Sequence, residues 1–317
     1  MEIKLYGTRG SIASPLQNRD FKKKVHDILN LYKTSGLGDI NEFWSGIPDH
    51  LKYLTGGDTT CVSITSSSGS RYMIDAGTGA RVFGDSLMQK EFAKGEGSIQ
   101  VFITHTHWDH IQGIPFFKPL YIPGNDIVFH SRYPDLEERL GKQMETEFFP
   151  ISFHSLAATK TFYTLKSDDR VEFADGVTVS SCPLKHPGGS TAYKFTENGK
   201  SFVFATDVEF TGNDFEYAKS LDGFFGGADV LVIDSQYTLD DSFSKFDWGH
   251  TAYTMAINCA HMWNIKNLVL THHEPVYDDY KIHEIEEMAL EHYDQLEKNT
   301  NKKMKIFIAR EGMNIQL

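Results

Sequence analysis

Hydrophobic residues recur along the chain in short runs, separated by turns that are rich in glycine, serine and proline. Short apolar or alternating runs bounded by such turns are typical of β-strands. Segments 61–66 and 71–75 flank a Ser/Gly turn, and this arrangement predicts a hairpin. The strands predicted in this way are 2–6, 61–66, 71–75, 99–103, 177–182, 191–196, 201–206, 228–234, 267–271 and 304–309.

Other segments repeat their apolar residues with helical spacing instead. Leu136, Leu140 and Met144, for example, follow one another at four-residue steps. The helices predicted from this spacing are 80–93, 134–147, 251–262 and 280–297. Because strands come mostly before helices within each half of the chain, we expect an α/β fold of two packed sheets flanked by helices.

Residues 15–55 interrupt the pattern of strands. Phe21, Val25, Ile28 and Leu29 have helical spacing, and the rest of the segment mixes glycine, proline and aromatic residues. We interpret the segment as an insertion that packs on the body of the protein. The segment either shapes the entrance to a site or lies on the surface without a role in the site, and the sequence favours neither interpretation.

The composition describes an ordinary globular protein, with 40% hydrophobic and 23% charged residues among 317. No apolar run approaches the length of a membrane span, and residues 1–6 do not resemble a signal peptide. The three cysteines, Cys61, Cys182 and Cys259, are widely spaced in apolar contexts, which favours reduced thiols and a cytoplasmic location. The formal net charge of −12 argues against binding of an extended nucleic acid.

The strongest chemical signal directly follows the predicted strand 99–103. His105, His107, Asp109 and His110 lie within six positions of one another, and such a cluster is an established way to hold transition metals. The His-x-His pair can direct two imidazoles at one ion, while the following Asp-His pair can reach a second. Four ligating groups within one turn rarely occur without a metal.

Two coordination shells need further ligands from elsewhere in the chain. Histidine or aspartate at strand ends, where loops converge, would supply them. Three positions fit: His186 follows strand 177–182, Asp207 follows strand 201–206, and His272 follows strand 267–271, with His273 as its rival. Asp75, at the end of strand 71–75, is expected to support the site or the fold rather than to act in catalysis.

The motif His-x-His-x-Asp-His, followed by a lone histidine, a lone aspartate and a last histidine, resembles the metallo-β-lactamase fold superfamily. The resemblance extends from the first strand to residues 309–312 and implies a single domain, 1–317, with an insertion at about 15–55. It also implies an αββα sandwich with a dinuclear site at one edge. By this resemblance, one metal would be held by His105, His107 and His186, the other by Asp109, His110 and His272, and Asp207 would bridge them.

A further motif resembles the RNase Z branch of that superfamily. Gly249-His250-Thr251 stands 22 residues before His272, like the additional histidine motif of that branch. The runs 7–11, 56–61 and 271–275 resemble a bacterial subgroup described as cyclic-nucleotide phosphodiesterase-like. The long glycine- and proline-rich basic arm with which RNase Z proper grips tRNA is not visible in this sequence, which argues against tRNA processing.

These residues permit hydrolysis of a phosphodiester. Asp109 would ligate one ion and orient the nucleophile, and His250 would donate a proton to the departing oxygen or stabilise phosphoryl charge. Arg9, Tyr237 and His273 are candidates for substrate contacts, with a surface ion pair as the alternative for Arg9 and core packing for Tyr237.

The sequence therefore predicts a cytoplasmic dinuclear phosphodiesterase that hydrolyses a small phosphodiester such as 3′,5′-cyclic AMP. The two divalent ions would be zinc, manganese or iron, since His and Asp ligands fit all three, and the resemblance implies a homodimer without a membrane partner. Alternatives on the same fold are a tRNA 3′-end endonuclease and a thioester or lactone hydrolase. A sensor that binds nucleotide or metal without turnover is the alternative from another class.

Overall fold

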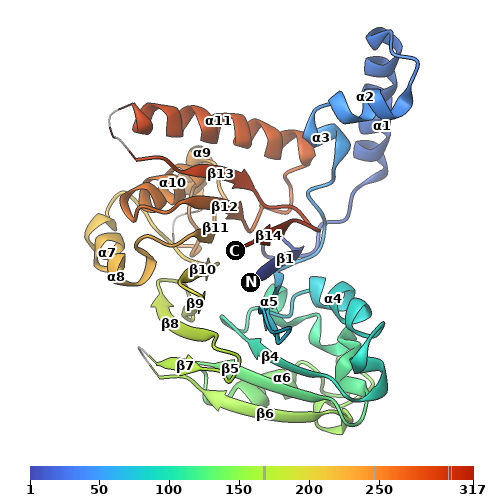
Figure 1. Ribbon diagram of the computed structural model, residues 1–317, viewed down its shortest axis with the longest axis vertical. Coiled ribbons are helices and arrows are strands. Elements are labelled where there is room, and N and C mark those ends of the chain that lie inside the picture. Colours follow the sequence, from blue (N-terminus) through green and yellow to red (C-terminus); the bar gives the residue numbers. More distant parts are fainter. Residues whose placement is uncertain (167–168, 246, 299, 301) are drawn as a thin grey trace.

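In the computed structural model, residues 1–166, 169–245, 247–298, 300 and 302–317 are described, and their strands form two seven-stranded sheets that face each other. Helices cover the outer face of each sheet, so the layers are α, β, β and α (Figure 1). The expected αββα sandwich of two mixed sheets is therefore confirmed. No helix in this part of the chain is long and apolar enough to cross a membrane.

The first sheet holds the beginning of the chain together with its last strand, which pair antiparallel beside each other. Its strands β3, β4, β5 and β6 run parallel. The spatial order is β14 (Asn314–Gln316), β1 (Glu2–Gly7), β2 (Cys61–Thr65), β3 (Arg71–Ile74), β4 (Ser98–Phe102), β5 (Asp126–Ser131) and β6 (Thr159–Thr164). The predicted hairpin of residues 61–75 is the antiparallel pair β2–β3.

The second sheet is built from the other half of the chain, and four of its strands, β10 to β13, run parallel. Its order is β13 (Lys305–Ile308), β12 (Asn267–Thr271), β11 (Val230–Asp234), β10 (Lys200–Ala205), β9 (Ser190–Glu197), β8 (Thr178–Leu184) and β7 (Arg170–Glu172). Parallel strands end at the same edge of a sheet, and ligands of α/β proteins bind outside those carboxyl ends.

The alternation of apolar residues along the strands explains how the layers pack. Residues such as Leu5, Ile64, Phe102, Phe204 and Val232 are fully buried between the two sheets. The remaining apolar positions face the outer helices α4 (Gly79–Leu87), α5 (Trp108–Ile111), α6 (Leu136–Lys142), α7 (Phe215–Ser220), α8 (Asp222–Phe225), α10 (Tyr253–Met262) and α11 (Asp279–Glu297), and the short 3₁₀ helices Glu91–Lys94, Ile114–Phe116, Lys118–Tyr121 and Phe153–Ser155. Helix α9 (Leu239–Ser244) lies outside this packing, with Leu239 and Phe243 exposed.

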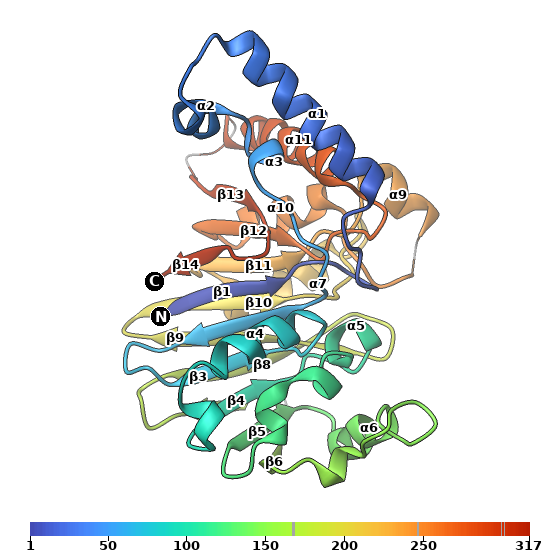
Figure 2. The ribbon, with the colours of Figure 1, turned by 90° about the vertical axis from the view of Figure 1, so that its right-hand side faces the viewer.

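The segment interpreted as an insertion forms an arm of three helices, α1 (Asn18–Ser35), α2 (Ile40–Gly46) and α3 (Asp49–Lys52). The arm rises from the body beside α11 (Figure 2). Its anchor is a buried ion pair in which Lys24 Nζ lies 2.5 Å from Asp279 Oδ2, while Asp279 Oδ1 accepts a hydrogen bond from the Thr55 amide. The helical spacing of Phe21 and Val25 correctly predicted α1.

Several predicted boundaries were wrong. The helix expected over 80–93 ends at Leu87, and the one expected over 134–147 is only Leu136–Lys142. Strands β5, β6, β7 and β14 were not predicted. Strand β5 is a short apolar stretch that follows a segment rich in glycine and proline, and it pairs in parallel with β4 within the buried sheet.

Candidate metal centre

The predicted metal ligands stand at the carboxyl ends of strands from both sheets, where the two sheets meet at one edge. His105 and His107 follow β4, Asp207 follows β10, and His272 follows β12. Asp207 and His272 have left-handed backbone conformations, with φ of +57° and +65°, as does Asp75 after β3 with φ of +55°. Non-glycine residues adopt this conformation rarely, and such strain clusters at functional sites.

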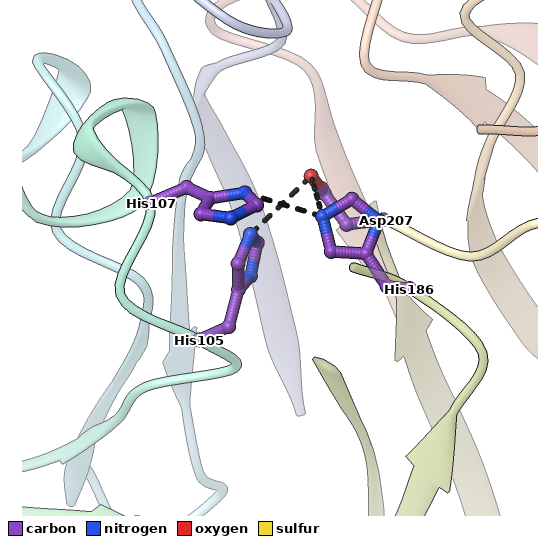
Figure 3. Close-up of side chains that lie close together, drawn as sticks. All are labelled: His105, His107, His186 and Asp207. Atoms are coloured by element: carbon purple, nitrogen blue, oxygen red, sulfur yellow. Dashed lines mark hydrogen bonds and ion pairs between the residues drawn. The ribbon is translucent and has the colours of Figure 1, made fainter. Parts of the chain in front are cut away.

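One group of side chains surrounds a first position in the centre (Figure 3). His107 Nδ1 lies 3.2 Å from His186 Nε2. Asp207 Oδ2 faces both His105 Nε2 at 3.4 Å and His186 Nε2 at 3.6 Å. The structure thus brings together three histidines and one carboxylate oxygen, with their ligating atoms within 4.8 Å of one another.

A second group adjoins the first and shares Asp207 with it. His110 Nε2 lies 3.1 Å from Asp207 Oδ1 and 3.2 Å from Asp109 Oδ2, and His272 Nε2 lies 3.4 Å from Asp207 Oδ1. The two carboxylate oxygens of Asp207 therefore face different groups. This is the geometry that a bridging carboxylate requires.

Buried polar atoms of the cluster that lack a hydrogen-bond partner show whether a metal would fit. Within the described part of the chain, the Nε2 atoms of His105, His110 and His272 are buried without a hydrogen-bond partner, although carboxylate oxygens lie within 3.1–3.4 Å of them. Buried polar atoms without partners are rare and costly. Divalent cations at the two positions would satisfy these nitrogens and balance the carboxylates, so the residues fit the ions.

The opposite ring nitrogens of these histidines are already engaged, which fixes each ring with its ligating atom inward. Asp75 Oδ2 lies 2.8 Å from His110 Nδ1, and the Gly249 carbonyl lies 2.8 Å from His186 Nδ1. Thr206 Oγ1 lies 3.1 Å from His272 Nδ1, and Thr104 Oγ1 lies 3.1 Å from His105 Nδ1. The two threonines and Gly249 were not predicted, because a residue next to a ligand carries no distinctive signal of its own.

The protonation states of several side chains in the centre favour the binding of cations. Burial lowers the pKa of His105 well below its usual value, and it lowers the pKa of His186 as well. Burial opposes ionisation of Asp207, but His110 and His272 outweigh it and hold the pKa of this carboxyl well below its usual range. Neutral imidazoles and ionised carboxylates are the forms that bind metals.

His110 differs from the other ligands in its protonation. Burial opposes its positive charge, but Asp207, Asp109 and Asp75 outweigh this effect and raise the pKa of His110 well above its usual value. A cation that binds here must therefore displace a proton from this ring.

At two positions the backbone lies so close to a ligand ring that only glycine fits. A Cβ on Gly249 would lie 2.3 Å from His186 Nδ1, and the backbone of Gly249 has a φ of +91°. A Cβ on Gly10 would lie 2.5 Å from the His272 ring. The glycines of runs 7–11 and 249–251 thus leave room for the ligand rings.

His250 lies beside the centre and has a partner of its own. Its Nδ1 lies 2.7 Å from Asp234 Oδ2, and its ring stacks on that of His272 at 5.0 Å. Asp234 is completely buried at the end of β11 and also accepts hydrogen bonds from the Gln236 and Thr251 amides. Burial opposes protonation of His250, but Asp234 and the nearby carboxylates outweigh it and raise its pKa to about 9.

Of the other predicted substrate contacts, Arg9 and His273 are bound elsewhere, whereas Tyr237 lies beside His250. The Arg9 guanidinium donates to the carbonyls of Gly56 and Tyr277, and His273 Nε2 donates to the Ala309 carbonyl at 2.9 Å. Both side chains are directed into the fold rather than toward the centre, so a substrate contact would require them to leave these partners. The ring of Tyr237 is buried and packs edge-on against His250, with ring centroids 5.7 Å apart. For the last ligand, the geometry places His272 in the centre and His273 outside it.

An open cleft of about 420 Å³ leads to the centre, within the range of roughly 300–1,000 Å³ that is usual for small-molecule sites. His250 and the ligand Asp109 both face it, and Asp109 Oδ2 accepts a hydrogen bond of 2.8 Å from the Ser11 amide. The cleft is lined by Ser11, Thr106, His107, Trp108, Asp109, Asp207 and His250.

The fold and the site define a metal-dependent hydrolase of the metallo-β-lactamase fold. A family model described as the β-lactamase superfamily domain matches residues 70–273, which is more than half of the chain, so the chain belongs to that superfamily. Within it, the chain is similar to ribonucleases Z. A ribonuclease Z from Prochlorococcus marinus (strain MIT 9301) is 23% identical over 287 residues, which are 74% of this chain and 86% of the relative.

Solved structures share the fold over the full chain. Unliganded yeast PDE1 superposes with a TM-score of 0.64 at 16% identity, and the match covers 100% of this chain and 99% of that one. Zn²⁺-bound PqqB from Methylobacterium extorquens superposes with a TM-score of 0.63 at 13% identity and covers 100% of both chains. The fold is thus known to hold divalent metal.

Proposed function

We propose that this protein is a dinuclear metal-dependent phosphodiesterase that hydrolyses a small phosphodiester, with a cyclic nucleotide such as 3′,5′-cyclic AMP as the substrate class. The observation that carries the proposal is the pair His250–Asp234. His250 faces the cleft beside two adjoining ligand groups that share Asp207. The Nδ1 atom of His250 is bound to Asp234, so its Nε2 atom is left for the substrate.

The two ligand groups and the Ser11 amide have different parts in the reaction. Divalent ions, when bound, supply charge neutralisation at the phosphoryl group and an activated water. His105, His107 and His186 form one ligand group, Asp109, His110 and His272 form the other, and Asp207 belongs to both. The Ser11 amide holds Asp109 Oδ2 at 2.8 Å, which fixes this carboxylate for orienting the nucleophile at the cleft.

His250 acts at the leaving group. Its Nε2 proton passes to the departing alkoxide oxygen as the bond from phosphorus to that oxygen breaks, and Asp234 stabilises the ring through Nδ1. This role argues against a carboxylic thioester as the substrate, because its thiolate leaving group needs no proton donor, whereas the alkoxide that leaves a phosphodiester does.

Replacement of His250 tests the proposal. We expect His250→Ala to reduce kcat for 3′,5′-cyclic AMP by about 10²–10⁴-fold, the usual contribution of a general acid. His250 also forms a third group with Asp234, Asp207 and His272, whose ligating atoms lie within 4.8 Å of one another, but its Nδ1 is engaged by Asp234, so we expect the metal content to remain that of the wild type. His154→Ala, at a histidine with 64% of its side chain exposed outside the cleft lining, is the matched control and should leave kcat unchanged. Unchanged turnover in His250→Ala would refute the assigned role.

The second candidate function is tRNA 3′-end processing, because the matched curated relatives are ribonucleases Z. The net charge of −12 weighs against it, since tRNA binding draws on clustered basic residues. Assaying 3′,5′-cyclic AMP and a 3′-extended tRNA side by side separates the two functions. Cleavage of the tRNA alone would overturn our preference, and cleavage of neither, with nucleotide bound stoichiometrically, would favour a sensor.

A further inference from the structure

The indole of Trp108 is exposed at the metal centre. Trp108 begins helix α5 between His107 and Asp109, and 78% of its surface is accessible to solvent. Trp108 lines the cleft, and among the described residues its side chain is found in no aromatic contact and no hydrogen bond. An aromatic ring that is largely exposed contributes little to the stability of the fold, so its place at the cleft calls for another explanation.

Two more exposed apolar residues stand next in sequence to residues of the cleft or of the centre. Ile12 is 60% exposed and follows Ser11, a residue of the cleft lining. Trp248 is 63% exposed and precedes Gly249, whose carbonyl holds His186. His107, which precedes Trp108, faces His186 in the centre, with His107 Nδ1 3.2 Å from His186 Nε2 (Figure 3).

The cleft therefore combines polar groups with one exposed aromatic residue. The ligand groups and His250 suit a charged reacting group, whereas Trp108 offers flat aromatic surface in the lining of the same cleft. Aromatic side chains beside a polar subsite are a common means of binding nucleobases by stacking.

We infer that Trp108 stacks on the nucleobase of the substrate and is a specificity-determining residue. The inference rests on the proposed phosphodiesterase function and narrows its substrates to diesters that carry a planar base. Stacking of a base on an aromatic side chain corresponds to about a 5- to 100-fold effect when the side chain is truncated to alanine.

Three diesters test the inference in the metal-loaded enzyme: 3′,5′-cyclic AMP, bis(4-nitrophenyl) phosphate, and glycerol 1,2-cyclic phosphate, which has no aromatic ring. We expect Trp108→Ala to lower kcat/KM for cyclic AMP about 5- to 100-fold, mainly through KM, and to leave the glycerol diester unchanged. Trp108→Phe, which keeps a ring, should recover most of the loss. Trp44→Ala removes a tryptophan that is 45% exposed on the arm, and this matched control should change nothing.

Equal losses for cyclic AMP and the glycerol diester would overturn the inference, as would a loss confined to the nitrophenyl ester, which has no base. A second readout does not depend on turnover. Binding of 5′-AMP should quench tryptophan fluorescence in the wild type and in Trp44→Phe, and this quench should be reduced in Trp108→Phe. If the wild type cleaves none of the diesters, the proposed function fails, and the quench still decides whether Trp108 stacks on a base. An unchanged quench would refute the stacking.

Discussion

Asp75 is the residue whose replacement most directly tests how the second ligand group is organised. Its carboxylate is completely buried, and Oδ2 lies 2.8 Å from His110 Nδ1 and accepts from Thr104 Oγ1 at 2.7 Å, while Oδ1 accepts from the Thr104 amide at 2.8 Å. Asparagine has the same shape and can keep one acceptor for Thr104. Its NH₂ group would then face the N–H of His110, so two donors would oppose each other.

The size of the effect follows from these contacts. Loss of a residue that orients a ligating histidine typically weakens metal binding by about 10- to 100-fold, which equals roughly 1.4–2.7 kcal/mol. A single hydrogen bond to a charged group contributes a similar amount, about 1.5–3 kcal/mol. We therefore expect Asp75→Asn to weaken the ion held by Asp109, His110 and His272 by about 10- to 100-fold, while the other ion is held nearly as before.

Competition with a chromophoric zinc chelator, followed by elemental analysis of the dialysed protein, measures this change. Asp229→Asn is the matched control, because Asp229 is also buried but binds Lys266 and the Ser201 amide at the amino ends of β10 and β11, away from the centre. The control should lose stability without losing metal. A folded Asp75→Asn protein that retains both ions with wild-type affinity would refute the proposed role of Asp75.

Two other predictions concern a glycine and a carboxyl group. Gly249→Ala places a Cβ 2.3 Å from His186 Nδ1 and should reduce metal content at the first group. The control Gly227→Ala, with a φ of +69° and open space around the added Cβ, should lower the stability of the fold without loss of metal. Equal metal loss in both variants would contradict this reasoning. Burial, aided by the Asp58 carboxylate, raises the pKa of Glu311 from 4.5 to about 6, so the folded state binds more protons between these pH values and loses stability as pH rises through them. Glu311→Gln lacks this titration, so its free energy of unfolding in urea, relative to that of the wild type, should rise from pH 4.5 to pH 6. A difference between the two proteins that is constant with pH would rule the explanation out.

The sequence by itself determined the fold class and the main chemistry of this protein. Alternating and apolar runs predicted most strands, since a side-chain period of two leaves few alternatives to a half-buried strand. The spacing of His105, His107, Asp109 and His110 on one turn is enough to indicate a metal site, because neighbours on a turn remain neighbours in any fold. His186, Asp207 and His272 could be proposed from their order at strand ends, which parallel strands bring to one edge.

Only the tertiary structure decided how these groups are oriented and what they contact. The partners of the ligand rings, such as Asp75 and Thr206, come from different strands, so their contacts depend on how the two sheets meet. The direction of Arg9 could not be predicted, because the carbonyls that capture it lie more than 45 residues away in the chain. Likewise, only packing shows that Trp108 stays exposed while the adjacent Asp109 turns inward to the centre.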